Sequence, residues 1–206
     1  LWSPLTRTSS PTGSMSQPRA LHQAVRLGDG RVLVCGGMDS LGNVTSSVEI
    51  FDPRTGVFTS GRSMNRARAG HAATLLGNGK ILVTGGVANY TDPLLNFAAD
   101  LDTAQATGEI FDPAAGTWTL LAGTMASKRS GHLQTLLPNG RVLISGGIQG
   151  GFTTPLGFQL PVFTPTANVF DPATNSFLAT GAMQRGRAFQ GASVLASGEV
   201  LVTGGV

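Results

Sequence analysis

One unit of 23 residues occurs four times in this chain, and it limits the available folds more than any other feature. The copy from Met64 to Gly86 reads MNRARAGHAATLLGNGKILVTGG. It contains a polar segment, a run in which apolar and polar residues alternate, a Gly-Asn-Gly turn, an apolar run and a glycine pair. In each copy a methionine stands 22 residues before the second glycine of the pair; these are Met15, Met64, Met125 and Met183. Equal spacing in four places predicts four copies of one structural unit.

The same residue types recur at fixed offsets within each copy. Four residues after the methionine stands an arginine: Arg19, Arg68, Arg129 and Arg187. Seven residues after it stands His22, His71 or His132, with Gln190 in the fourth copy. The turn that follows contains Asn-Gly, Asp-Gly or Ser-Gly, which suits the positive φ angles of a hairpin. The next run, such as Ile81-Leu82-Val83, is β-branched and apolar, so we expect a strand buried on both faces.

A second block follows three of the four glycine pairs. It starts at Glu49, Glu109 and Asn168 and continues as Ile/Val-Phe-Asp-Pro. Four residues after each Asp comes Gly or Asn, which suits a left-handed turn position. Two residues later comes an aromatic side chain: Phe58, Trp118 or Phe177. We therefore expect a third strand that ends at Asp-Pro and a fourth strand that carries the aromatic residue.

Composition agrees with strands and tight turns. Charged residues make up 12% of the chain and glycine contributes 29 residues, which disfavours charged amphipathic helices. The net charge is +3, but the basic residues are spread thinly, so no nucleic-acid partner is expected. No apolar run reaches 18 residues, so no membrane span is expected. Cys35 lies in an apolar run and is expected to be a small buried residue.

Four strands per repeat, with a glycine pair after the second, are typical of propeller blades. The motif resembles the kelch repeat, through the Arg and His of the first strand, the double Gly, the Asp-Pro block and the aromatic of strand four. In two copies Phe stands where the kelch pattern favours Trp. The resemblance implies an all-β fold, a β-propeller of four-stranded antiparallel blades.

Blade boundaries follow from the repeat. We expect a single propeller segment over 1–206, with complete blades at about 15–63, 64–124 and 125–182 and a partial blade at 183–206. Residues 1–5 resemble the start of the strand at Trp118 and are interpreted as the last strand of a preceding blade. The chain is thus expected to be an incomplete propeller whose partners include the remaining blades of a longer chain. A four-bladed ring is the alternative.

Two long insertions, 87–108 and 148–167, separate a glycine pair from the third strand. In antiparallel blades they share a face with the segments between methionine and arginine. The resemblance places the first strand innermost, so Arg19, Arg68, Arg129 and Arg187 are expected near the channel mouth. One interpretation is a positive rim that binds a carboxylate, phosphate or acidic peptide. The other is that these arginines bond backbone carbonyls and build the fold, which recurrence in every copy favours.

The insertions differ between copies, so they are candidates for binding. Tyr90 and Asp92 lie in the first, and Phe152 and Phe158 lie in the second. They are predicted to cap the channel mouth and contact a sugar or peptide; the alternative is that the insertions pack on each other. A short helix within 98–106 is weakly signalled.

No catalytic residue, metal site or cofactor is predicted. Histidines on neighbouring sheets would stand about 10 Å apart, whereas zinc needs its ligands at about 2 Å. Buried histidines that hydrogen-bond to backbone are expected instead. No nucleophile elbow, metalloprotease helix or phosphate-binding loop occurs, and Asp52, Asp112 and Asp171 are expected to cap turns.

The sequence therefore favours a non-catalytic propeller that binds a protein or glycan on the face with the long insertions. Likeness to bacterial kelch proteins with few lysines favours an extracellular or cell-surface setting. The alternative is the propeller part of a galactose-oxidase-like or other sugar-processing enzyme with its catalytic residues elsewhere. One Tyr and one Cys cannot supply that oxidase's copper site within this stretch.

Overall fold

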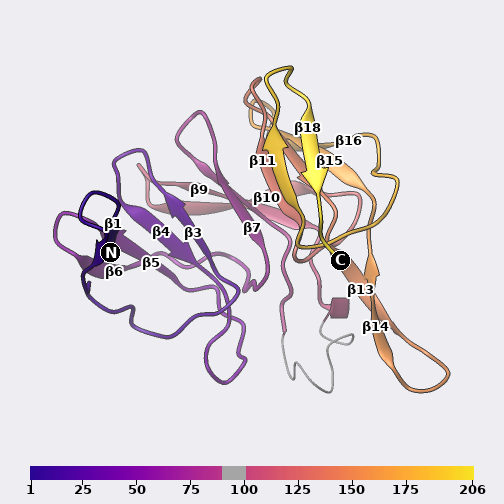
Figure 1. The fold of residues 1–206 in the computed structure, drawn as a ribbon, viewed down its shortest axis with the longest axis horizontal. Coiled ribbons are helices and arrows are strands. Elements are labelled where there is room, and N and C mark those ends of the chain that lie inside the picture. The colour runs from indigo at the N-terminus through magenta and orange to yellow at the C-terminus, as the bar shows by residue number, and fades with distance from the viewer. Residues whose placement is uncertain (90–100) are drawn as a thin grey trace.

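The computed structural model describes residues 1–89 and 101–206, and its ordered elements are almost entirely β-strands (Figure 1). Three four-stranded antiparallel sheets form the body. The first blade contains β3 (Gln23–Arg26), β4 (Val32–Cys35), β5 (Val48–Asp52) and β6 (Val57–Gly61). The second contains β7 (Ala72–Leu75), β8 (Ile81–Thr84), β9 (Thr107–Asp112) and β10 (Thr117–Thr124). The third contains β11 (Leu133–Leu136), β12 (Val142–Ser145), β15 (Ala167–Asp171) and β16 (Ser176–Ala179). The predicted four-stranded units are confirmed.

Local turn chemistry explains why each blade folds in this order. Strands β5, β9 and β15 all end at the predicted aspartate. The left-handed position after it is occupied by Gly56, Gly116 and Asn175, at φ 72°, 64° and 52°. At this turn the Gly56 N–H donates to the Asp52 carbonyl at 2.8 Å, which closes the connection to the fourth strand. Glycine, and to a lesser degree asparagine, tolerates this backbone.

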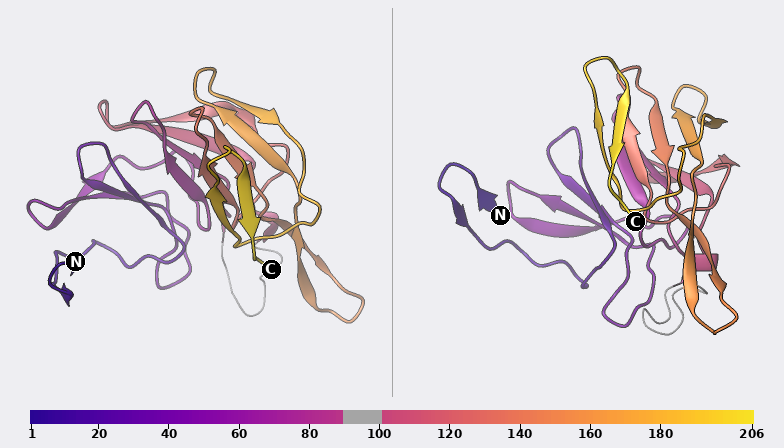
Figure 2. Two further views of the ribbon diagram at one scale, coloured as in Figure 1. Left: turned by 45° about the horizontal axis from the view of Figure 1, so that its top comes forward. Right: turned by 45° about the vertical axis from the view of Figure 1, so that its right-hand side comes forward.

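The sheets follow one another in chain order and touch through their first strands, β3 to β7, β7 to β11 and β11 to β17 (Gly191–Val194). Strand β17 pairs only with β18 (Val200–Thr203). Figures 1 and 2 show the sheets fanning out around their inner edge. Among the described residues, neither β17 nor β18 contacts β3, so these sheets do not close into a ring.

The core lies between neighbouring sheets. Leu33 and Cys35 of the first blade pack with Ile81 and Val83 of the second in one cluster of buried side chains. A second cluster joins the second and third blades, and contains Leu82, Ile110, Val142, Ile144 and Phe170. The strand-four aromatics complete this packing: the ring centroids of Phe111 and Trp118 are 4.9 Å apart. Burying second strands on both faces stabilises the stack, as their apolar sequence predicts.

The start of the chain forms a hairpin that was not anticipated, and the assignment of residues 1–5 to a preceding blade stays a prediction. Strand β1 (Trp2–Ser3) pairs with β2 (Thr8–Ser9), with Trp2 opposite Ser9. The same register joins Phe51 to Phe58 in the first blade. Arg7 has φ 56°, and its N–H donates to the Ser3 carbonyl at 2.8 Å, as Gly56 does to Asp52. By this register Trp2 corresponds to Phe51, at the end of a third strand, as well as resembling Trp118 of a fourth strand. The third and fourth strands of a blade both carry an aromatic residue, so the aromatic alone does not distinguish them.

The insertion at 148–167 is also more ordered than the predicted loop. It contains a hairpin of β13 (Ile148–Thr153) and β14 (Gln159–Phe163) that projects away from the blades (Figure 1). Within the predicted helix at 98–106, the described residues Leu101 and Asp102 are helical, and Ala104 already bridges to Val87. In the part of the chain that the structure describes, no helix is long and apolar enough to cross a membrane.

Candidate functional site

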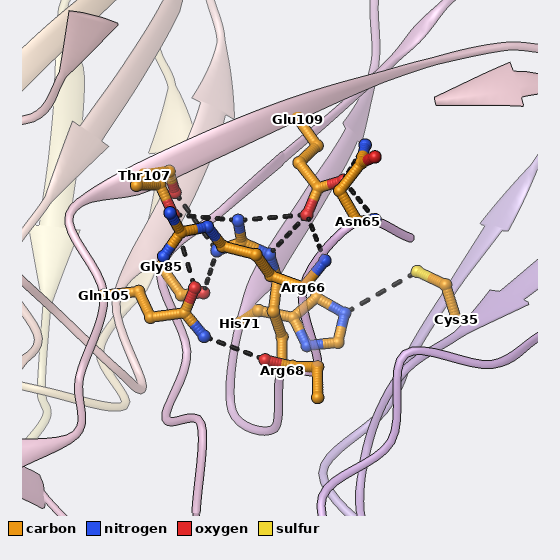
Figure 3. A network of polar contacts seen from close by, with 10 residues as sticks. Cys35, Asn65, Arg66, Arg68, His71, Gly85, Gln105, Thr107 and Glu109 are labelled. Atoms are coloured by element: carbon orange, nitrogen blue, oxygen red, sulfur yellow. Dashed lines mark hydrogen bonds and ion pairs between the residues drawn. The ribbon is translucent and has the colours of Figure 1, made fainter. Parts of the chain in front are cut away.

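The arginine of each repeat lies inside its blade. In the second blade, Arg68 Nη1 donates to the Gly85 carbonyl at 2.7 Å and the Thr107 carbonyl at 3.2 Å. Its Nη2 donates to Thr107 Oγ1 at 2.9 Å and Glu109 Oε1 at 3.2 Å. Figure 3 shows this network. Both charged side chains are 0% exposed, so the guanidinium ties the segment before β7 to the end of β8 and the start of β9.

The other blades repeat this arrangement. Arg19 donates to the Gly36 carbonyl at 2.9 Å and pairs with Glu49 at 3.1 Å. Arg129 donates to the Gly146 carbonyl at 2.7 Å. Arg187 donates to the Gly204 carbonyl at 2.9 Å and is only half-buried.

The expected exposed positive rim is therefore not formed by Arg68 and Arg129, whose side chains are fully buried. The Arg68 guanidinium already bonds two carbonyls and a carboxylate, so it has little capacity left for a ligand. Every bond that these arginines make agrees with the architectural interpretation. Ligand binding by Arg19, Arg68, Arg129 or Arg187 stays a prediction.

Burial controls the charges in these networks. It lowers the pKa of Arg68, while Glu109 acts in the opposite direction. Burial alone lowers the pKa of Arg129 to about 10. Burial tends to raise the pKa of Glu49, but the Ser16 N–H and Arg19 outweigh it and leave that pKa below its ordinary value. At neutral pH Arg68 and Arg129 are therefore cationic and Glu49 is ionised.

The histidines connect each blade to the one before it. His132 Nε2 lies 2.8 Å from Thr84 Oγ1, and His71 Nε2 lies 3.6 Å from Cys35 Sγ. In the fourth copy Gln190 Nε2 donates to the Ser145 carbonyl at 2.9 Å. Burial is expected and confirmed for His71 and His132. The Nε2 partners above are side chains, and backbone groups of Arg68 and Cys35 also act on the His71 ring. Among the described residues, no group of three His, Cys, Asp or Glu could hold a metal ion.

Burial keeps the His71 imidazole and the Cys35 thiol uncharged at neutral pH. It lowers the pKa of His71 to about 3, with a smaller contribution from Arg68. It raises the pKa of Cys35 to about 12, so the thiol stays protonated. The prediction of a buried, unpaired cysteine is confirmed.

The two insertions pack on each other at their bases. Val87, Leu101 and Ala104 of the first insertion join Ile148 of the second in one buried cluster. Asp102 Oδ1 accepts a hydrogen bond from the Gly151 N–H at 3.4 Å. Tyr90 and Asp92 lie outside the described residues. The structure thus supports mutual packing for the described bases of the insertions.

The hairpin beyond these bases is exposed. Phe152 is 51% exposed and Phe158 is 65% exposed. Phe152 pairs with Leu160 across the hairpin, and paired residues share one face of a two-stranded sheet. Between Ile148 and Phe163 the sequence has no charged residue. The result is an apolar, uncharged arm beside the blades.

Two shallow depressions beside the insertions were not anticipated from sequence. One of about 460 Å³ is lined by the segment before β11 and by β13 and β14; its residues are Ala126, Ser127, Lys128, Gln149, Gly150 and Val162. Another of about 550 Å³ lies beside Arg66, Thr103 and Gln105. The sequence signal for the arm was the alternation on both sides of Pro155-Leu156-Gly157, which is typical of a hairpin.

Comparison with known proteins agrees with the repeat found in the structure. Residues 19–65 match the family model described as the Kelch motif. This range covers all four strands of the first blade, and the second and third blades repeat its sheet order. No curated protein matches the chain. The chain thus contains a kelch motif in its first blade, and its repeated four-stranded sheets are consistent with kelch blades.

Proposed function

We propose that this chain is a non-catalytic binding module that recognises a protein or a glycan through its insertion face. The insertion face comprises the connections from second to third strands, with residues 38–47, the described parts of 87–106, and 148–166. Kelch repeats commonly serve in binding, which supports the general role. The exposed, uncharged hairpin of β13 and β14 is the observation that carries the more specific proposal.

The opposite face offers less to a ligand. Its turns between third and fourth strands carry charges that are already paired. Lys80 lies 3.0 Å from Asp112, and Arg141 lies 2.8 Å from Asp171. An exposed apolar group contributes more to binding than a solvated ion pair, because burial removes its surface from water. Aromatic side chains also suit the apolar faces of sugars and peptide side chains.

A second feature of the insertion face is a set of three basic side chains. Arg66 and Arg185 are exposed, and Lys128 is half-buried and lies 3.7 Å from Asp102. They lie in the segments between methionine and arginine, where the positive rim was expected. These side chains support recognition of a ligand that joins an apolar group to an acidic one.

Array binding tests the proposal. Labelled chain is applied to glycan and peptide arrays, together with a Phe152→Ser, Phe158→Ser double variant. The control is Leu178→Ser on β16, whose side chain is 44% exposed and lies outside the insertion face. We expect at least a tenfold loss of binding for the double variant and none for the control. Unchanged binding of a folded double variant contradicts the proposal.

A further inference from the structure

The third blade lacks an acidic partner for its buried arginine. Glu49 and Glu109 accept bonds from the arginines of the first two blades, but Asn168 stands at this position in the third. Arg129 is 0% exposed. Its Nη2 lies 3.4 Å from Asn168 Oδ1, and its Nε has no hydrogen-bond partner among the described residues.

The second blade shows which acceptor is missing. Glu109 Oε2 accepts from the Asn65 N–H at 2.7 Å. Glu109 Oε1 accepts from the Arg66 N–H at 3.1 Å and from Arg68 Nε at 3.2 Å. Asn65 Nδ2 and Arg68 Nη2 also donate to this carboxylate, so its two oxygens satisfy five donors in the second blade.

Asn168 replaces only one of these two oxygens. Its Oδ1 accepts from the Ala126 N–H at 3.1 Å, as Glu109 Oε2 does from Asn65, and its amide nitrogen donates to the Leu178 carbonyl at 3.3 Å. The counterparts of the remaining donors are the Ser127 N–H and Arg129 Nε. Neither has an acceptor within the described part of the chain. Asparagine is also one methylene shorter than glutamate and offers one acceptor oxygen in place of two.

The local charge balance favours an anion. The nearby Lys128 is already paired with Asp102 at 3.7 Å, so the positive charge that lacks a counter-ion is that of Arg129. A buried cation without a counter-ion is costly. Ser127 and Lys128 also line the depression of about 460 Å³, which gives solvent a route toward this segment.

We propose that the third blade binds a small monovalent anion, such as chloride, between the Ser127 N–H and Arg129 Nε. The anion takes the place that Glu109 Oε1 has in the second blade. It neutralises Arg129 and completes the network that joins the segment before β11 to β12 and β15. This site is separate from the exposed hairpin, so it does not depend on the proposed binding function.

Chloride itself is the probe. Sodium chloride replaces sodium gluconate at constant ionic strength, and the ³⁵Cl line width and the thermal midpoint of the chain are measured. We expect excess broadening that saturates with chloride. For a dissociation constant of some tens of millimolar, linkage predicts a rise of about 3 °C in the midpoint at 300 mM chloride.

Asn168→Glu supplies the carboxylate that the other blades have, so we expect this variant to fold and to lose both chloride effects. The matched control is Asn78→Asp, which adds one negative charge at a turn where the first blade has Asp29. The control should keep both effects. The proposal is overturned if the unmodified chain shows no chloride-specific broadening, as when water fills the space, or if Asn168→Glu keeps it. Equal loss in both variants also overturns it.

Discussion

Replacing His71 and His132 together by glutamine is expected to make the unfolding free energy nearly independent of pH between 7 and 5. Burial is the main cause that lowers the pKa of His71 to about 3, and it holds the pKa of His132 well below 6.5. In the unfolded chain both rings take up a proton near pH 6.5. As the pH falls, protons bind these rings in the unfolded chain before they bind in the folded chain. The contribution of the two rings to the unfolding free energy is therefore fully present above pH 6.5 and is lost as the pH drops toward 3.

The size of this effect follows from the pKa difference. One pKa unit corresponds to about 1.4 kcal/mol. Between pH 6.5 and 5 each histidine loses about 2 kcal/mol of stability, and the pair loses about 4 kcal/mol. The carboxyl of Glu49 does not add to this loss, because its pKa lies below 4.5 and it is ionised throughout the interval. A loss of 4 kcal/mol is a large part of the stability of an ordinary domain.

Glutamine is the substitution that the chain already contains. Gln190 holds the equivalent position and donates to the Ser145 carbonyl at 2.9 Å, so a glutamine fits between two blades. Urea denaturation at pH 7, 6 and 5 measures both proteins. The unmodified chain should lose about 4 kcal/mol and the double variant under about 1 kcal/mol. Equal losses in the two proteins would refute the assignment of the acid sensitivity to these rings.

Two pairs of substitutions test the contacts that hold the blades together. Glu109→Ala leaves Arg68 buried without a counter-ion and is expected to cost about 3–5 kcal/mol in urea denaturation. Asn168→Ala removes only an amide and should cost about 1 kcal/mol, so equal costs would contradict the ion-pair argument. Gly85→Ala places a Cβ against the Arg129 carbonyl oxygen and should abolish soluble expression. Gly79→Ala has open space and should cost only about 1–2 kcal/mol; a similar result for both would show that the close approach is unimportant.

Strand order could be predicted because its causes are local. Gly79 and Gly140 have positive φ, while Asn78 and Asn139 do not. This is the hairpin loop in which one residue after a turn is left-handed, and glycine suits that position, so sequence shows such turns directly. The second strands were expected to end at the glycine pairs, and they do. The structure differs from expectation where the local pattern was ambiguous. Trp2 resembles both Phe51 in a third strand and Trp118 in a fourth strand. Residues 148–163 have the composition of a loop, but their apolar and polar residues alternate as in a strand.

The candidate site was harder to predict because its contacts are distant in sequence. Arg68 and Glu109 are separated by 41 positions, and sequence alone did not join them. A signal existed: Glu49 and Glu109 recur at one place in two blades, as the arginines do. Their joint recurrence could have indicated an ion pair. The exposure of Phe152 depends on how the arm leaves the blade, which the sequence does not encode locally.

The central claim is that repeated residues build the frame while the insertion of the third blade binds a ligand. Exchanging residues 148–165 for the shorter connection 38–46 of the first blade tests it most directly. Thermal unfolding and array binding are measured on the same preparation. The account predicts a folded chain whose melting temperature changes by only a few degrees and whose array binding is lost. A folded exchange variant that binds as well as the original would contradict the claim.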